Sequence, residues 1–416
     1  MKLFVKILKA WWFPWLTLGA ILRLTVAAVT VHPDTWALNF TSYLFAFRGI
    51  PNIYDYLASL SPFHEWSKLY GPAVFTYPPF AYFTLGTFMA ILKPFFNFSF
   101  MNWFVNHSLN ESFGNPEIFR HLFLLKLPYL FFDLGIALLL LKEGKGKFLL
   151  WIFNPLAFYS SFMVGQFDVI PVFFVILGLY LAASGRKNWA VVSLGIGGSL
   201  KLFPLLFLPL FVLIMGKNNW EKAKLAVLGI LPYSLTILPF LSSPAFRQVV
   251  LFSNQSQKML FMGLPVSGAE TIYVFVFFLV MLWLWVGYGK RQISDLWKYV
   301  LVTLLLFFSV THYHPQWFLW VTPFLIWELT ENNFRHVAIV VILFFCWLTI
   351  TFLFEPSLSY GLFSPLWPKL GKVQGLSEFL SPYINVFQFK SITRSIFAGA
   401  SLFLVFRLFA DEKVNA

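Results

Sequence analysis

The sequence predicts an all-α, polytopic integral membrane protein in which residues 1–416 form a single transmembrane domain. Hydrophobic residues make up 59% of the chain and charged residues only 11%, whereas soluble domains have about 45–50% apolar and about 25% charged residues. Apolar runs recur from Trp11 to Phe409, and no polar block between them is long enough to form a separate core. By their lengths, these runs predict about 11–13 transmembrane or re-entrant helices.

Charge and motif content exclude several classes of function. The formal net charge is +13, but the basic residues lie in short clusters between apolar runs, which is typical of cytoplasmic loops and not of a surface that binds nucleic acid. The one cysteine, Cys346, excludes an intrachain disulfide and a cysteine-based metal site. There is no Walker loop, no Gly-x-Gly-x-x-Gly and no His-Glu-x-x-His, so nucleotide, dinucleotide and zinc-protease functions have no support.

The basic clusters also set the expected orientation, because such clusters favour the cytoplasmic side of a membrane. A multi-pass protein of the plasma or ER membrane with a cytoplasmic N-terminus follows if these clusters are all inside: Lys2/Lys6/Lys9, Lys142/Lys145/Lys147, Arg186/Lys187, Lys217/Lys222/Lys224, Lys290/Arg291, Arg335 and Arg407/Lys413.

The first crossing and the loop after it follow from this orientation. The apolar run 10–31 lacks a small-residue cleavage signal, so it is expected to be a retained first crossing. It places residues 32–76 outside as a first external loop. The aromatic stretches 36–47 and 54–60 of this loop are expected to be interfacial helices that lie on the bilayer.

The next part of the chain has two alternatives. An odd number of crossings must return the chain to the cytoplasm before Lys142, but two apolar stretches are present, 74–96 and 119–141. One of them is therefore re-entrant or interfacial, or one basic cluster breaks the charge rule. We favour a re-entrant 77–96 over a 77–96 that spans the membrane.

From Lys147 onward, apolar runs form pairs that cross the membrane and turn on its outer side: 148–163 with 168–184, 189–200 with 202–215, 225–241 with 269–288, 296–310 with 317–329, and 336–354 with 392–409. Several runs are shorter than the roughly 20 residues that span a bilayer. They are expected to end around a water-filled outer cavity. The external segments 242–268 and 355–390 are either a lid or rim of that cavity or passive loops.

Polar side chains are costly in a membrane domain, so their positions indicate function. Five polar groups interrupt or flank the apolar runs, and all five map to the outer side: His32-Pro33-Asp34, Tyr77-Pro78-Pro79, Asn154-Pro155 with Gly165-Gln166-Phe167-Asp168, Ser199-Leu200-Lys201-Leu202-Phe203-Pro204, and His312-Tyr313-His314-Pro315-Gln316-Trp317. This agreement predicts one polar site that faces away from the cytoplasm.

Each group also has a structural interpretation. Asp34 could be a solvated carboxylate at a helix end, and Gln166 with Asp168 could cap a helix that begins near Val169. His314 could belong to an interfacial aromatic belt. Lys201 is the hardest to explain structurally, because no other charge lies near it in its apolar run, so it either snorkels or pairs with an anion.

Two further ionisable residues have a structural explanation of their own. Lys126 and Asp133 are seven residues apart, which places them on one face of a helix. We therefore expect them to form an ion pair inside the membrane.

One carboxylate, an isolated cation and imidazoles at an outer cavity suit group transfer from a lipid-linked phosphate donor. A lysine or histidine can stabilise the negative charge that grows on the departing phosphate. A carboxylate can accept the proton of an attacking hydroxyl group. A single carboxylate implies direct displacement with inversion, because retention normally uses a second carboxylate about 5–5.5 Å away.

At these residues the chain resembles the GT-C superfamily of glycosyltransferases, and within it the polyprenyl-phosphate-mannose-dependent mannosyltransferases and the catalytic subunit of GPI mannosyltransferase I. The resembling pieces run from His32 to Pro204, with a further match at 314–316: His32-Pro33-Asp34-Thr35-Trp36, Gly49-Ile50-Pro51 with Tyr54, Tyr77-Pro78-Pro79, Asn154-Pro155, Gly165-Gln166-Phe167-Asp168, Lys201-Leu202-Phe203-Pro204 and His314-Pro315-Gln316.

The resemblance implies a dolichyl or polyprenyl phosphate sugar as donor and an essential acidic residue in the first external loop, which here is Asp34. Eukaryotic relatives have Asp-x-Asp at this place, whereas this sequence has His32 at the first position. No cofactor is therefore assigned, and a role for a divalent cation is left open.

The sequence thus predicts a membrane glycosyltransferase that moves a sugar, expected to be mannose, to a glycan or glycolipid acceptor on the extracytoplasmic face. The expected roles are as follows: Asp34 as general base, Lys201 and His314 as partners of the donor phosphate, and Gln166, Asp168, Tyr77, Gln316 and His32 as sugar or acceptor contacts. The alternatives are a secondary transporter of a small polar solute and a non-catalytic subunit, in which Asp34, Lys201 and His314 need not share one cavity.

Overall fold

Long apolar runs fold into helices in this chain, as expected where a segment has to satisfy its own backbone hydrogen bonds in a membrane. The computed structural model describes residues 9–71 and 73–414, and Lys2 and Lys6 of the first basic cluster lie outside them. In the described residues, two three-residue strands, β1 (Gly263–Pro265) and β2 (Thr271–Tyr273), form an antiparallel pair. Helices make up the regular structure elsewhere, which confirms the all-α prediction.

The first half of the chain contains the following helices, with η for 3-10 or π turns: α2 (Phe13–Val29), α3 (Pro33–Arg48), α4 (Ile53–Ser59), α5 (Glu65–Tyr70), α6 (Pro79–Ile91), η1 (Lys93–Phe95), α7 (Phe98–Val105), η2 (Leu109–Ser112), α8 (Glu117–Glu143), α9 (Lys145–Ile152), α10 (Pro155–Ala157), η3 (Phe158–Met163), α11 (Val169–Ala183), α12 (Lys187–Leu200), η4 (Phe203–Phe207) and α13 (Leu208–Met215).

The second half contains the remaining helices: α14 (Asn219–Ile237), η5 (Leu238–Phe240), α15 (Pro244–Phe246), η6 (Arg247–Leu251), η7 (Lys258–Leu260), α16 (Val274–Tyr288), η8 (Ile293–Asp295), α17 (Leu296–Val310), η9 (Pro315–Trp320), α18 (Thr322–Glu331), α19 (Val337–Phe352), η10 (Pro356–Leu358), η11 (Tyr360–Phe363), η12 (Pro368–Lys372), α20 (Leu376–Leu380) and α21 (Val386–Val414).

Several helices are long and apolar enough to cross a membrane. In the described chain there are four such helices, or five if the bent pair α2 and α3 counts as one span: Glu117–Glu143, Asn219–Phe240, Ile293–Val310 and Val386–Ala410. Five shorter apolar helices include α6, which has only 13 residues. At about 1.5 Å per residue, α6 is too short to cross a hydrocarbon core of about 30 Å alone.

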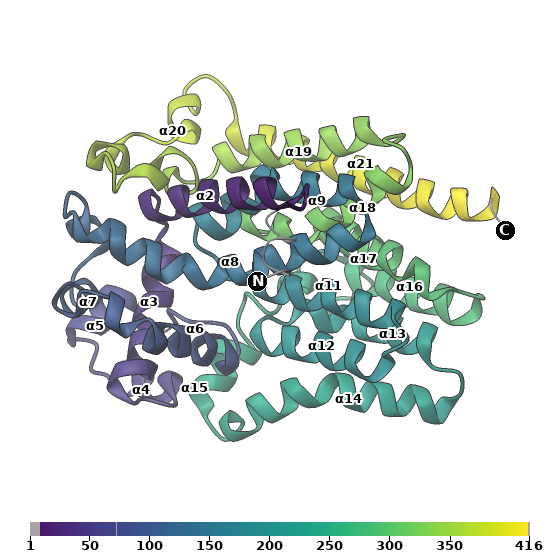
Figure 1. Cartoon of the computed structure of the whole chain (residues 1–416), viewed down its shortest axis with the longest axis horizontal. Coiled ribbons are helices and arrows are strands. Elements are labelled where there is room, and N and C mark those ends of the chain that lie inside the picture. The colour runs from purple at the N-terminus through teal and green to yellow at the C-terminus, as the bar shows by residue number, and fades with distance from the viewer. Residues whose placement is uncertain (1–8, 72, 415–416) are drawn as a thin grey trace.

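The helices lie side by side and place the predicted external segments at one end of the molecule. Helix α11 packs against α8 and α12, and α12 packs against α14. Figure 1 shows α3, α4, α5 and α7 at the same end as α20, whereas the turn between α13 and α14, the turn between α16 and α17 and the C-terminus lie at the opposite end. The clusters Lys217/Lys222/Lys224 and Lys290/Arg291 belong to those two turns or flank them.

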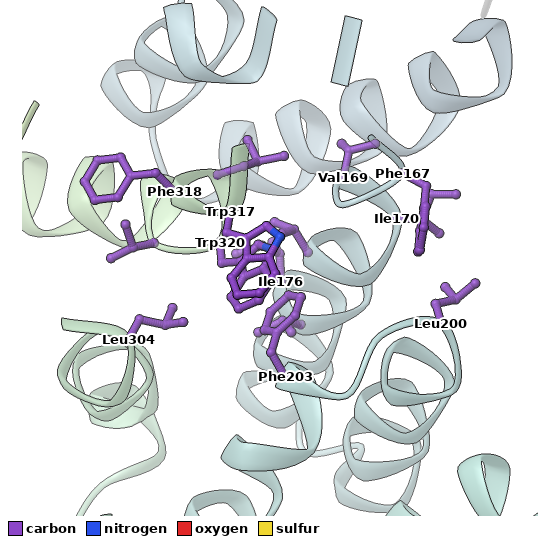
Figure 2. Close-up of a cluster of buried hydrophobic side chains, with 14 of the residues drawn as sticks. Phe167, Val169, Ile170, Ile176, Leu200, Phe203, Leu304, Trp317, Phe318 and Trp320 are labelled. Atoms are coloured by element: carbon purple, nitrogen blue, oxygen red, sulfur yellow. The ribbon is translucent and has the colours of Figure 1, made fainter. Parts of the chain in front are cut away.

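Most buried apolar side chains of the described chain form one large cluster that includes residues from Ala27 to Leu408, and a second, small cluster contains Val31, Phe100, Phe104, Ile118 and Leu122. Part of the large cluster lies where α11, η4 and η9 meet. Figure 2 shows Trp317 and Trp320 beside one another above Phe203. The Trp320 ring stacks on Phe203 at 4.2 Å and on Trp317 at 5.0 Å between ring centroids. Aromatic packing thus fixes η9 against the chain that follows α12.

The expected ion pair between Lys126 and Asp133 is wrong, because each residue has other partners. Arg23 Nε lies 2.6 Å from Asp133 Oδ2, and both side chains are fully buried. Lys126 Nζ instead donates hydrogen bonds to backbone carbonyls of Ala27, Thr30 and Phe162 at 3.1, 2.6 and 2.9 Å. Seven residues along one helix place two side chains on one face, but α2 and η3 supply nearer partners for both.

Candidate active site

Asp34 lies at a sharp bend between two helices. Helices α2 and α3 meet at 87°, and Pro33 is the first residue of α3, a position that suits proline because it needs no backbone N–H there. His32 caps α3, since its Nδ1 accepts a hydrogen bond from the backbone N–H of Asp34 at 3.1 Å. The other ring nitrogen, Nε2, lies 3.8 Å from Glu355 Oε1.

Two amides hold the Asp34 carboxylate. Its Oδ2 accepts hydrogen bonds from Gln166 Nε2 and, at 3.3 Å, from Gln316 Nε2. The two glutamine side chains come from the chain before α11 and from the first turn of η9, and both residues are buried. The Asp34 side chain is 38% exposed, so one side of the carboxylate stays accessible to a ligand.

The backbone around Gln166 is tied to α3, to α8 and to the π turn η3. Thr35 Oγ1 donates to the carbonyl of Val164 at 2.7 Å, and the Gln166 N–H donates to the carbonyl of Ser160 at 3.0 Å. Gly165 between them has φ +78°, and a Cβ there would lie 2.2 Å from Thr35 Oγ1. Glycine is therefore required for this close approach, which places Gln166 against Asp34.

Lys201 is paired and surrounded by aromatic rings. Its Nζ lies 2.6 Å from Asp168 Oδ1, and it lies 5.0–5.7 Å from the centroids of four rings, those of Tyr77, Phe167, Trp317 and Trp320. Asp168 is fully buried and does not line the cavity described below, so it holds Lys201 and is not placed for the expected contact with a sugar.

A cavity of about 360 Å³ opens beside Asp34 and is lined by polar and apolar groups. This volume lies within the range of about 300–1,000 Å³ that small-molecule sites occupy. The polar lining consists of His32, Asp34, Thr76, Tyr77, Gln166, Lys201, Gln255, Ser256, Lys258, His314, Gln316 and Glu355, and the apolar lining includes Leu202, Phe203, Leu206, Val250, Met259, Phe307, Trp317 and Trp320.

The sequence-predicted residues therefore converge, with one exception. His32, Asp34, Tyr77, Gln166, Lys201, His314 and Gln316 all line this cavity, and Asp168 lies directly behind Lys201. These residues come from five separate stretches of the chain. His314 lines the cavity as a neutral imidazole, because burial and the charge of Lys258 lower its pKa to about 4.

Two ionisable residues of the cavity had no assigned role in the sequence. Lys258 and Glu355 belong to the segments 242–268 and 355–390, for which a rim and a passive loop were both open. Both residues line the cavity, so at these positions the segments form part of its wall. Their position in the two expected external segments could have pointed to them. Other charged residues, such as Arg247 and Lys372, lie in the same segments, so this position alone does not single them out.

No group of three histidine, cysteine, aspartate or glutamate side chains among residues 9–71 and 73–414 has an arrangement that could hold a metal ion. His32 stands where the Asp-x-Asp motif would have its first aspartate, and its Nδ1 caps α3. The Asp34 carboxylate thus contacts the amides of Gln166 and Gln316 and the imidazole of His32.

Comparison with known proteins gives no further assignment: no family model, no curated protein and no solved structure matches this chain.

Proposed function

We propose that this chain is an integral-membrane, inverting glycosyltransferase that moves mannose from a polyprenyl or dolichyl phosphate donor to a glycan or glycolipid acceptor on the extracytoplasmic face. The observation that carries the proposal is the Asp34 carboxylate, which is held by Gln166 and Gln316 and faces a cavity with both cationic and apolar walls. The resemblance of 32–204 and 314–316 to GT-C glycosyltransferases supports the same assignment.

The arrangement suits direct displacement at a sugar carbon. Asp34 accepts the proton of an acceptor hydroxyl, whose oxygen forms a bond to C1 of the donor sugar. The bond between C1 and the phosphate oxygen breaks, its electron pair stays on that oxygen, and the lipid leaves as a phosphate monoester. The amide N–H groups of Gln166 and Gln316 orient the carboxylate, because each donates to the same oxygen, Oδ2.

Inversion is expected because an imidazole ring lies between the two carboxylates that line the cavity. Retention requires a second carboxylate within about 5–5.5 Å of the first one, where it can act as a nucleophile. Glu355 also lines the cavity, but the His32 ring lies between it and Asp34, with Nδ1 toward Asp34 and Nε2 toward Glu355. A single base at Asp34 therefore gives a product of inverted configuration.

The walls of the cavity suit the two ends of such a donor. Leu202, Leu206, Phe307 and Met259 form an apolar side that fits the first isoprene units of a lipid. Lys201 and Lys258 place positive charge in the same cavity, where a phosphate has to be accommodated. The basic turns at the opposite end of the molecule support an extracytoplasmic cavity under the charge rule.

The proposal predicts that Asp34→Asn nearly abolishes transfer. The amide keeps the size of the side chain but cannot accept a proton, so the rate should fall by about 10²–10⁴-fold, the usual contribution of a general base. The measurement is transfer of label from polyprenyl-phosphate mannose to an extract of host glycolipids by detergent-purified protein, with the anomeric configuration of the product determined by NMR.

A matched control lies on the same external segment. Glu65→Gln removes an exposed carboxylate outside the cavity and should leave the rate unchanged. Asp34→Asn protein that keeps most of its activity would remove Asp34 from the mechanism. Wild-type protein that transfers no sugar from any lipid-linked donor would contradict the proposed function itself.

A further inference from the structure

Of the two lysines that line the cavity, Lys201 is paired with Asp168, whereas Lys258 has no carboxylate partner among the described residues. Lys258 lies on the 3-10 turn η7 and is only 7% exposed, and its ammonium group makes no ion pair or hydrogen bond with any residue that the structure describes. The ammonium group makes a cation–π contact with Trp317, because Lys258 Nζ lies 4.8 Å from the centroid of the Trp317 ring. A buried ammonium group that lacks an anion is costly, which indicates a site built for one.

The neighbours of Lys258 do not reduce this cost. Lys201 has its charge balanced by Asp168 at 2.6 Å. Arg394, which lies over the ring of Tyr313 at 5.1 Å, adds a further positive charge close enough to perturb Lys258. His312 and His314 face the same region, and both are neutral at pH 7, because burial first and nearby cations second lower the pKa of each to about 4.

The positive charge that faces the open volume of the cavity without compensation is therefore that of Lys258. We infer that Lys258 binds the phosphate group of an isoprenoid phosphate in this cavity, and that Lys201 is a positioning residue held by Asp168. This inference deepens the proposed function and rests on it for the lipid part of the ligand. It transfers the main phosphate contact from Lys201 and His314, where the sequence placed it, to a residue of η7.

The inference gives a pH dependence with a definite sign. Burial, followed by the charges of Lys201 and Arg394, lowers the pKa of Lys258 to about 8. The ammonium form binds an anion, so affinity should be full below this pKa and should fall as the pH rises through it. His312 and His314, which face Lys258, do not change charge between pH 7 and 9.5. His32 also lines the cavity, and against the effect of burial Asp34 and Glu355 raise its pKa to about 9, so a fall in affinity centred near pH 8 belongs to Lys258 and one centred near pH 9 to His32.

The test measures binding to detergent-purified protein by calorimetry, without any sugar donor. The probes are citronellyl phosphate, which is a short isoprenoid monophosphate, citronellol as its uncharged analogue, and inorganic phosphate. Lys258→Met should weaken binding of citronellyl phosphate about tenfold or more, as expected for loss of a charge-assisted hydrogen bond. Lys258→Arg should restore most of it, and the exposed Lys372→Met should match the wild type.

Wild-type protein gives a second measurement that does not depend on a variant. Its affinity for citronellyl phosphate should fall between pH 7 and 9.5, while its affinity for citronellol stays constant. Equal binding of the two lipids, unchanged affinity in Lys258→Met, or a flat pH profile would each overturn the inference. Inorganic phosphate that binds as tightly as citronellyl phosphate would also overturn it, since the site would then take a free anion.

The outcomes separate the inference from the proposed function. Binding that depends on Lys258, without sugar transfer from any lipid-linked donor, would support the anion site and contradict the glycosyltransferase. Sugar transfer by Lys258→Met with an unchanged KM for the donor would support the glycosyltransferase and contradict the role of Lys258.

Discussion

His314 lines the cavity as an uncharged imidazole, because burial and Lys258 lower its pKa to about 4. We therefore predict that His314→Gln, which keeps an N–H donor, retains most of the transfer rate, whereas His314→Phe loses about two- to tenfold, the value of a neutral hydrogen bond. Between pH 5 and pH 7, the transfer rate should show no rise or fall that is due to the titration of His314. A limb near pH 6 that disappears in His314→Gln would contradict the prediction.

At the same scale, the sequence predicted the centre of the site better than its rim. Asp34, Gln166, Lys201 and Gln316 stand out because a polar side chain inside or beside an apolar run is costly and needs a reason. Lys258 does not stand out in this way. It lies in a segment with ordinary polar content, and only the tertiary path of η6 and η7 turns it toward Trp317.

At the scale of elements, Lys126 fixes the spacing between the two segments that carry Asp34 and Gln166. Its ammonium group donates to carbonyls of Ala27 and Thr30 at the end of α2 and of Phe162 in η3. Lys126→Met should therefore lower both the thermal unfolding temperature and the transfer rate, because each buried carbonyl left unsatisfied costs about 1–3 kcal/mol.

Thermal unfolding in detergent, followed by intrinsic fluorescence, measures the stability of this variant. Lys142→Met on the same helix is the matched control, since Lys142 is exposed and donates to the hydroxyl of Tyr180. An unfolding temperature of Lys126→Met equal to that of the control would show that the three carbonyls find other donors. Loss of transfer with unchanged stability would instead place Lys126 in the site.

Element boundaries were predicted where proline and charge mark them. The expected crossing 10–31 and interfacial helices 36–47 and 54–60 correspond to α2, α3 and α4. The expected helix over 148–163 is wrong, because the chain is broken into α9, α10 and η3. Asn154 accepts hydrogen bonds from the backbone N–H groups of Leu156 and Ala157 and so starts a new turn. The π turn η3 that follows has no local sequence signal.

At the scale of the whole molecule, basic turns gather at one of the two ends. Figure 1 shows α3 to α7 toward one end of the molecule and the turns between α13 and α14 and between α16 and α17 at the other. The first turns of α3 line the cavity. Single cysteines at the two ends can distinguish their sides of the membrane. Phe63, between α4 and α5, is 82% exposed, and Tyr288, at the end of α16, is 91% exposed.

In a Cys346→Ala background, which removes the one native cysteine, we predict that a membrane-impermeant maleimide labels Phe63→Cys in intact cells. Tyr288→Cys should be labelled only after the membrane is permeabilised, because Lys290 and Arg291 beside it favour the cytoplasm. Both variants should be labelled equally in detergent, which controls for access within the fold. The reverse pattern in intact cells would place Asp34 and Lys258 on the cytoplasmic side, and an extracytoplasmic glycosyl transfer would then be excluded even if the cavity binds an isoprenoid phosphate.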